Sequence, residues 1–258
     1  MADEITVKLD GRVVKARRHE MALAVAARNG VTIPTLCHHD DLEPLGACRL
    51  CLIEVTRNGR TKVVTACNYP VEDGVEIVTS SPELRRHRAT VIELLLSRCP
   101  DVPALRALAA EHGVEAPRYG VGEDSCILCG LCTRVCEAYA TSAIALFGRG
   151  DRKQLGTPAD EPPPDCVGCG ACVKICPTGH ISEAREAGRY SVWERDFPVM
   201  VCGVDADACL ACGMCEESCP FSVARVALRR PARCRRPSER PGHAPTPASP
   251  RPCQRTAP

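Results

Sequence analysis

The chain has 258 residues, of which 45% are hydrophobic and 25% are charged, as in ordinary globular proteins. It contains 20 cysteines but only 3% aromatic residues, so a conventional aromatic-rich core is not expected. No stretch reaches the ~18 consecutive apolar residues of a membrane span, and the first residues lack the features of a secretory signal. In a reducing cytoplasm, this many cysteines indicate metal or redox chemistry rather than disulfides. We therefore expect a cytoplasmic protein without a membrane span.

The formal net charge is +1, but the charge is distributed unevenly along the chain. Residues 229–258 contain eight arginines, one glutamate and eight of the 22 prolines. Such a segment cannot bury enough apolar surface to offset the entropy of ordering it, so we predict a disordered tail there. The remainder of the chain is acidic overall, which argues against nucleic-acid binding.

Two β-hairpins and one helix are predicted in the first 80 residues. Alternating apolar residues and two turn signals, Asp10-Gly11 and Asn58-Gly59, indicate the hairpins. The alanine-rich segment 20–29 predicts a helix that ends at Gly30. The strands are expected at 5–9, 12–16, 52–57, 61–64 and 75–79. This order predicts a small mixed sheet with a helix packed on it.

Two helices are predicted next. Ser81-Pro82-Glu83 is typical of a helix start, and the helix is expected over 82–97. A second helix over 102–112 ends at Gly113. Beyond it, residues 119–226 form glycine-rich and cysteine-rich blocks, interrupted by a proline-rich linker or surface loop at 158–164.

The first cysteine group has the spacing C-x10-C-x2-C-x15-C and comprises Cys37, Cys48, Cys51 and Cys67. Its first loop is able to fold around a compact inorganic core, with the last thiolate supplied at the end of the next strand. Four thiolates suit a 2Fe–2S cluster, although this spacing is also compatible with zinc. The neighbouring His38 and His39 are expected to be solvent-facing rather than Rieske-type ligands.

Two further groups share the spacing C-x2-C-x2-C-x3-C, in which three thiolates wrap one cluster and the fourth binds the other cluster of the pair. Gly130, Gly168 and Gly170 allow the tight bends that this wrapping requires. One departure is Glu137, which stands where a proline usually follows the fourth cysteine. We predict a crossed pair of 4Fe–4S clusters: cluster A on Cys126, Cys129, Cys132 and Cys176, and cluster B on Cys166, Cys169, Cys172 and Cys136.

A fourth group repeats this spacing without a partner group and comprises Cys209, Cys212, Cys215 and Cys219. It predicts a third 4Fe–4S cluster whose fourth ligand is undecided. Cys219 could close the site itself, or Cys202 or Cys234 could do so. The alternative is a cluster that is lost or shared with a partner chain.

No catalytic residues are predicted. The chain has no G-x-G-x-x-G motif after a strand and no P-loop, so we expect no flavin or NAD site on it. No nucleophile–base constellation is visible. Cys99, at a helix end, is expected to be an inert packed thiol.

The chain resembles a known family in the segments Ile33-Pro34-Thr35-Leu36-Cys37, Gly46-Ala47-Cys48-Arg49-Leu50-Cys51, Ala66-Cys67 and Cys176-Pro177-Thr178-Gly179. They are similar to the start of the large iron–sulfur subunit of respiratory complex I and to the small diaphorase subunit of NAD-reducing hydrogenases. NAD-linked formate dehydrogenases and iron-only hydrogenases share the module. The His plus three-Cys cluster of complex I-type members is expected to be missing, since its region offers only His87 and Cys99.

The resemblance implies an α+β architecture with ferredoxin-like parts. The expected units are a plant-type β-grasp 2Fe–2S ferredoxin domain at 1–80, a helical linker at 81–118, a two-cluster 4Fe–4S ferredoxin-like domain at 119–190, an additional 4Fe–4S motif at 191–228 and the disordered Arg/Pro-rich tail at 229–258.

The resemblance further implies a non-catalytic electron-transfer subunit of a multisubunit NAD(P)-linked oxidoreductase. It would pass electrons along one 2Fe–2S cluster and two or three 4Fe–4S clusters. Expected partners are a diaphorase subunit that binds flavin and NAD(P), and a hydrogenase or formate dehydrogenase catalytic subunit. The alternatives are a stand-alone small iron–sulfur reductase and a redox sensor.

Overall fold

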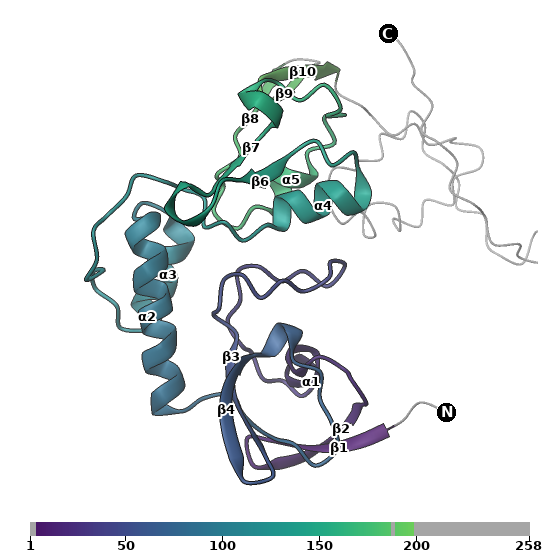
Figure 1. Cartoon of the computed structure of the whole chain (residues 1–258), viewed down its shortest axis with the longest axis vertical. Helices are drawn as coiled ribbons and strands as arrows, with labels where there is room; N and C mark the ends of the chain where they lie inside the picture. The colour runs from purple at the N-terminus through teal and green to yellow at the C-terminus, as the bar shows by residue number, and fades with distance from the viewer. Residues whose placement is uncertain (1–3, 187–188, 199–258) are drawn as a thin grey trace, which may run out of the picture.

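The computed structural model describes residues 4–186 and 189–198 (Figure 1). The predicted tail at 229–258, the fourth cysteine group at 209–219 and Cys202 therefore lie outside the described residues. The described part is mixed α and β, as predicted from the sequence.

The N-terminal part contains a five-stranded sheet with the strand order β2-β1-β5-β3-β4. Its strands are β1 (Glu4–Leu9), β2 (Arg12–Arg17), β3 (Leu52–Arg57), β4 (Arg60–Thr65) and β5 (Glu76–Val78). Strands β1 and β5 pair in parallel, and the other pairs are antiparallel. Both turn signals are confirmed, because Asp10-Gly11 and Asn58-Gly59 have the positive φ angles of a two-residue hairpin turn.

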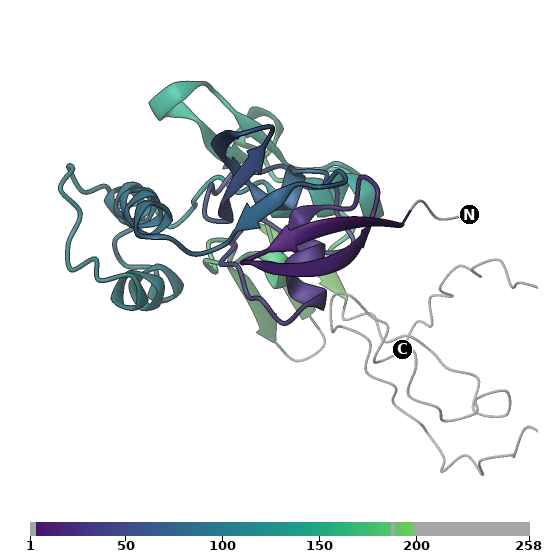
Figure 2. The same cartoon turned by 90° about the horizontal axis from the view of Figure 1, so that it is seen from below.

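Helix α1 (Ala22–Arg28) packs on this sheet, as the sequence predicts, although it is shorter than the expected 20–29. Its Val25 and Ala26 are fully buried together with Val7 and Ile53 of the strands. Figure 2 shows α1 behind the first hairpin. Burying the apolar face of the helix against the inner face of the sheet forms the first core.

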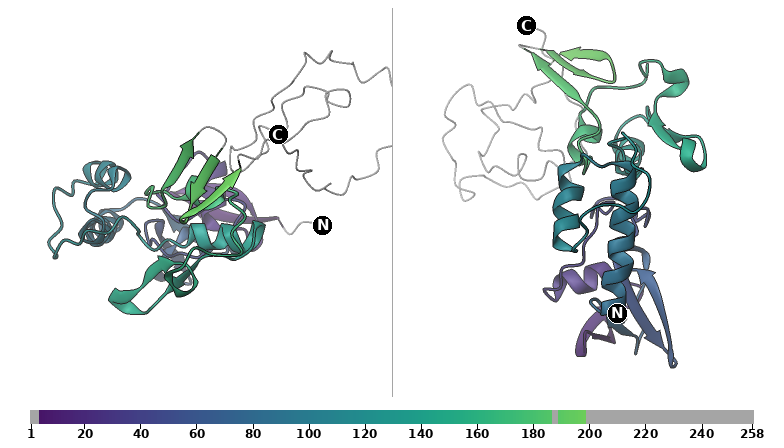
Figure 3. Two further views of the ribbon diagram at one scale, coloured as in Figure 1. Left: turned by 90° about the horizontal axis from the view of Figure 1, so that it is seen from above. Right: turned by 90° about the vertical axis from the view of Figure 1, so that its left-hand side faces the viewer.

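Helices α2 (Pro82–Arg98) and α3 (Pro103–Glu111) follow, close to their predicted bounds. The Ser81 hydroxyl caps α2 by accepting a 3.1 Å hydrogen bond from the Leu84 N–H. The two helices lie side by side (Figures 1 and 3). Helix α2 runs from the five-stranded sheet to the cysteine-rich part, and the shorter α3 lies beside the end of α2 nearer the cysteine-rich part. No helix among the described residues has the length and apolar character needed to cross a membrane.

The cysteine-rich part contains short elements that the sequence did not predict. They are helices α4 (Leu131–Tyr139) and α5 (Ala171–Ile175), the hairpin of β6 (Ala145–Phe147) and β7 (Gln154–Gly156), and the antiparallel sheet of β8 (Glu183–Glu186), β9 (Arg189–Val192) and β10 (Arg195–Pro198). Each helix begins directly after a glycine in the left-handed conformation, Gly130 or Gly170. Helices α4 and α5 contact each other, which brings the second and third cysteine groups together.

Candidate metal centres

The first cysteine group converges in the structure. Cys37, Cys48, Cys51 and Cys67 are all buried, and the Cys48 N–H lies 3.4 Å from the Cys37 sulfur. A hydrogen bond between the two side chains lowers the pKa of Cys48 to about 5 and raises the pKa of Cys37. A second such bond lowers the pKa of Cys51 to about 7 and raises that of Cys67. The four thiols are thus in contact as two pairs, Cys37 with Cys48 and Cys51 with Cys67.

The loop around this group is held by unusual backbone conformations. Gly46 and Arg49 both have positive φ angles, of 67° and 57°. A β-carbon at Gly46 would lie 3.0 Å from the Asn68 side chain, so glycine fits the close approach to the segment that carries Cys67. The Arg49 conformation is uncommon for a residue with a side chain, and it lies within the Cys48–Cys51 turn.

The expectation for the two neighbouring histidines was partly wrong. The side chains of His38 and His39 are only 24% and 34% exposed, rather than solvent-facing. Each lies near an aspartate of its own loop, Asp40 or Asp41. They are half-buried loop residues.

The second and third cysteine groups interleave. Cys176 lies close enough to the Cys126, Cys129 and Cys132 thiols that its charge helps to raise their pKa values, in addition to burial. Burial raises the pKa of Cys129 to about 11 and that of Cys132 to about 12. The structure therefore brings the last cysteine of the third group to the first three of the second.

The converse grouping is also present. Burial raises the pKa of Cys166 and Cys172, and charges on Cys169 and Cys136 raise them further. Cys136 is the last cysteine of the second group, on α4. Cys136 thus lies near Cys166 and Cys172 of the third group, just as Cys176 lies near the first three cysteines of the second group.

Matching bends shape the two loops. Leu128 and Gly168 hold the same position of their loops, with φ angles of 56° and 66°. Gly130 and Gly170 do so two residues later, with φ angles of 70° and 72°. These bends point backbone donors at sulfur: the Leu128 N–H lies 3.4 Å from the Cys126 sulfur.

Hydrogen bonds also act on Cys176. Burial raises the pKa of Cys176, but hydrogen bonds from the Thr178 hydroxyl and nearby N–H groups outweigh the effect of burial and lower the pKa overall.

The chemistry of these donor sets fits iron–sulfur clusters. Every described cysteine is a free thiol, and backbone N–H groups point at several sulfurs, as cluster sites require. Among residues 4–186 and 189–198, no three His, Cys, Asp or Glu side chains form a ready site for a single metal ion. Which thiols bind iron stays a prediction.

Arg88 links α2 to the first cysteine loop. It is only 5% exposed, although charged. Its guanidinium donates to the carbonyls of Leu50, Leu52 and Thr79 at 3.2, 2.5 and 2.9 Å. Burial lowers the pKa of Arg88, and the nearby Cys51 charge acts against that change. A positive charge is therefore fixed beside the first cysteine group.

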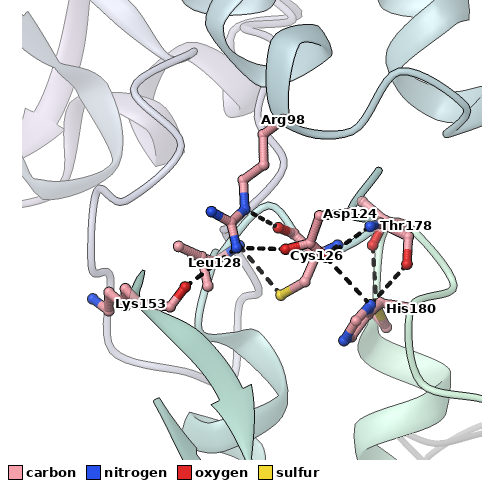
Figure 4. A network of polar contacts seen from close by, with 9 residues as sticks. Arg98, Asp124, Cys126, Leu128, Lys153, Thr178 and His180 are labelled. Carbon is pink, nitrogen blue, oxygen red and sulfur yellow. Dashed lines mark hydrogen bonds and ion pairs between the residues drawn. The ribbon is translucent and has the colours of Figure 1, made fainter. Parts of the chain in front are cut away.

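Arg98 links the end of α2 to the second cysteine loop (Figure 4). It donates to the Cys126 carbonyl at 2.8 Å, to the Asp124 carboxylate at 2.5 Å and to the Lys153 carbonyl at 3.2 Å. Asp124 in turn accepts 2.8 Å bonds from the N–H groups of Ser125 and Cys126. This network sets the start of the loop relative to α2.

Cys99 lies next to this network and is fully buried. Burial raises its pKa to about 12, and the charges of Asp124 and Cys126 add to that effect. Its complete burial in the apolar cluster around α2 and α3 fits the expected role of a packed thiol.

Arg134 on α4 joins the first and second cysteine loops. It donates to the carbonyls of Cys37 and Glu43 at 2.8 and 2.5 Å, and to that of Gly130 at 3.2 Å. The Tyr139 hydroxyl adds a 3.1 Å bond to the Asp41 carbonyl. The spacing between the two loops is therefore fixed by side chains of one helix.

We predict that Arg134→Ala loosens this contact while the five-stranded sheet stays intact. Losing the bonds to the carbonyls of the buried residues Cys37 and Gly130 removes ~1–3 kcal/mol of local stability. Hydrogen exchange of the holoprotein should become faster in residues 37–45 and stay unchanged in β1–β5. The control is Arg106→Ala, since the side chain of Arg106 is 63% exposed and its ion pair lies on the surface. Unchanged exchange in 37–45 would contradict the prediction.

Comparisons with known families agree with the cysteine chemistry. Residues 2–82 match the family of 2Fe–2S iron–sulfur cluster binding domains. Residues 120–182 and 165–223 each match a family of 4Fe–4S dicluster domains. The chain therefore carries one 2Fe–2S domain and 4Fe–4S dicluster domains. The expected order, a 2Fe–2S domain followed by 4Fe–4S dicluster domains, is confirmed.

Its relatives are subunits of pyridine-nucleotide oxidoreductases. The chain is 32% identical over 231 residues to the NADPH-Fe(3+) oxidoreductase subunit alpha of Geobacter sulfurreducens, a match that covers 80% of this chain and 27% of that protein. It is 30% identical over 182 residues to the mitochondrial NADH-ubiquinone oxidoreductase 78 kDa subunit of Candida albicans, covering 60% of this chain and 25% of that protein. The chain thus spans about a quarter of the length of these curated relatives.

A solved structure shares the fold. A chain of the NAD+-reducing NiFe hydrogenase in the H2-reduced state matches with a TM-score of 0.60 and 29% identity. The match covers 68% of this chain and 86% of that chain. The resemblance to NADH-quinone oxidoreductase subunits and to NAD-reducing hydrogenases is therefore confirmed.

Proposed function

We propose that this chain is the electron-transfer subunit of a multisubunit NAD(P)-linked oxidoreductase. Iron–sulfur clusters supply one-electron carriers. The chain's own contribution is to present thiolates, to direct N–H groups at sulfur and to fix the spacing between the sites. The interleaving of the second and third cysteine groups carries the proposal, because a crossed pair of cysteine groups is the arrangement of two-cluster ferredoxins.

The ligand sets follow the groups that converge. The 2Fe–2S cluster is assigned to Cys37, Cys48, Cys51 and Cys67, cluster A to Cys126, Cys129, Cys132 and Cys176, and cluster B to Cys166, Cys169, Cys172 and Cys136. Arg134 then bridges the 2Fe–2S site and cluster A, while contact between α4 and α5 joins cluster A to cluster B. Electrons pass along this series.

We also propose a third 4Fe–4S cluster on Cys209, Cys212, Cys215 and Cys219, with Cys202 as a possible extra ligand. The dicluster match at 165–223 supports it, since that match covers the fourth group. In the described residues, the third cysteine group already pairs with the second group. The cluster of the fourth group therefore needs a fourth ligand that does not come from the third group.

The proposed partners follow from the relatives. They are a diaphorase subunit that binds flavin and NAD(P), and a catalytic subunit of the hydrogenase or formate dehydrogenase type. The hydrogenase match favours the first of these catalytic partners. We place the complex in the cytoplasm and assign no flavin or NAD site to this chain.

Iron and acid-labile sulfide per chain test the proposal after anaerobic purification. We expect about 14 irons for all four clusters, and about 10 if the fourth group needs a partner chain. Little iron with stoichiometric zinc would overturn the electron-transfer function. Stoichiometric flavin on the purified chain would favour a stand-alone reductase instead.

The crossed ligands are tested by a matched pair of variants. Cys176→Ser should perturb cluster A, although Cys176 belongs to the third cysteine group, whereas Cys136→Ser should perturb cluster B. EPR spectra of the reduced holoproteins should therefore lose or alter different 4Fe–4S signals. Cysteine-to-serine changes that each disturb the cluster of their own group would contradict the crossed assignment.

A further inference from the structure

The sheet of β8, β9 and β10 covers the loop that carries the third cysteine group. A β-carbon at Gly168 would lie 2.3 Å from the Phe197 ring, and one at Gly170 would lie 3.0 Å from the Tyr190 hydroxyl. Trp193 packs in the same apolar cluster, together with Cys172 and Cys166. Three aromatic side chains of a protein with few aromatics therefore meet at one cysteine loop.

Arg195 connects this sheet to the start of the loop through hydrogen bonds. Its guanidinium donates to the carbonyls of Pro163, Pro164 and Cys166 at 2.5, 2.8 and 2.8 Å. It also lies 5.1 Å from the centre of the Phe197 ring. The position of the sheet over the loop is thus set by direct contacts.

Trp193 sits in a backbone conformation that its residue type disfavours. Trp193 and Glu194 form the two-residue turn between β9 and β10, with φ angles of 53° and 58°. Asn and Gly are the usual residues of such turns, because a bulky side chain is unfavourable at positive φ. A tryptophan at this strained turn points to a role for its side chain.

The indole N–H of Trp193 has no conventional partner. Its Nε1 is buried and makes no hydrogen bond of normal geometry within the described part of the chain. It nevertheless lies in the same buried cluster as Cys172, within side-chain hydrogen-bonding range of that sulfur. A buried donor next to a sulfur is suited to an acceptor that carries more negative charge than a thiol.

We propose that the Trp193 indole N–H donates a hydrogen bond to the Cys172 sulfur of bound cluster B and thereby raises the reduction potential of that cluster relative to cluster A. This inference rests on the proposed function. A donor at a cluster sulfur stabilises the reduced form, which carries one more negative charge. Trp193 is thus a tuning residue that does not itself bind iron.

The single tryptophan of the chain allows a selective test. Incorporating benzothienylalanine in a tryptophan auxotroph replaces only the Trp193 indole N–H with sulfur and keeps the ring shape. Redox titrations of the holoprotein, followed by EPR, should show cluster B reduced at a more negative potential. We expect about a tenfold change in its reduction equilibrium, about 59 mV for a one-electron couple. Trp193→Phe should change the potential in the same direction.

Two controls belong to the same experiment. Cluster A is an internal control, and its potential should stay unchanged; the Cys136→Ser variant identifies which signal is cluster B. With indole-15N tryptophan, pulsed EPR of the reduced protein should detect a nitrogen coupling to cluster B. An unchanged potential without a 15N coupling, in a protein that holds cluster B, would overturn the role of Trp193 alone. A wild-type protein without 4Fe–4S signals would instead overturn the proposed function, and this inference with it.

Discussion

Replacing Arg88 with methionine should lower the free energy of unfolding of the holoprotein by ~2–4 kcal/mol. The guanidinium satisfies three backbone carbonyls, those of Leu50, Leu52 and Thr79. Methionine keeps the apolar stem within the stripe of α2 that faces the protein, but it donates no hydrogen bonds. Buried acceptors without donors account for the loss of stability.

The same change should also affect the first cysteine group. Arg88 lies near Cys51, whose charge influences its pKa. Removing a buried positive charge beside a cluster disfavours the more negative, reduced form, so the potential of the 2Fe–2S cluster should become more negative. A guanidinium chloride titration followed by circular dichroism and an EPR-monitored redox titration measure the two effects.

Arg86→Met is the matched control, because Arg86 is exposed on the same helix. It should change stability by less than ~0.5 kcal/mol. The stability of the Arg88→Lys protein should fall between those of the Arg88→Met and Arg86→Met proteins. An ammonium group keeps the charge, but it lacks the planar guanidinium that reaches three carbonyls. Equal stability of the Arg88→Met and Arg86→Met proteins would show that Arg88 does not hold α2 to the loop.

The N-terminal fold could be predicted because its signals are local. Asp10-Gly11 and Asn58-Gly59 specify two hairpins through residues that accept positive φ, and alternating apolar residues identify the buried faces. Arg88 could not be predicted in the same way. In the sequence it lies among polar residues typical of a solvated face, and only the tertiary structure shows that it points at three carbonyls.

The cysteine-rich part shows a different limit. The spacing of its cysteines predicts the type of site, since few metal centres need this repeat. The positions that shape the loops are less visible: Leu128 adopts positive φ without being glycine, and the Trp193-Glu194 turn lacks the usual turn residues. Neither place has a residue type that favours positive φ, so a single sequence gives no signal for these bends.

Gly168→Ala should abolish iron binding at cluster B. A β-carbon at this position would lie 2.3–2.7 Å from three atoms of the Phe197 ring. The loop or the sheet must then move, and Cys166 and Cys169 move with the loop. We expect the variant to lose about four irons per chain, the content of one 4Fe–4S cluster.

A second substitution separates the clash from backbone strain. Leu128 holds the equivalent position of the second loop at a φ of 56°, so a side chain there is compatible with the bend. The fourth cysteine group has Ala211 at this position. Phe197→Ala should therefore restore iron binding to the Gly168→Ala protein if the ring is the obstacle. Continued loss of about four irons in the double variant would mean that the positive φ, rather than Phe197, requires glycine at this position.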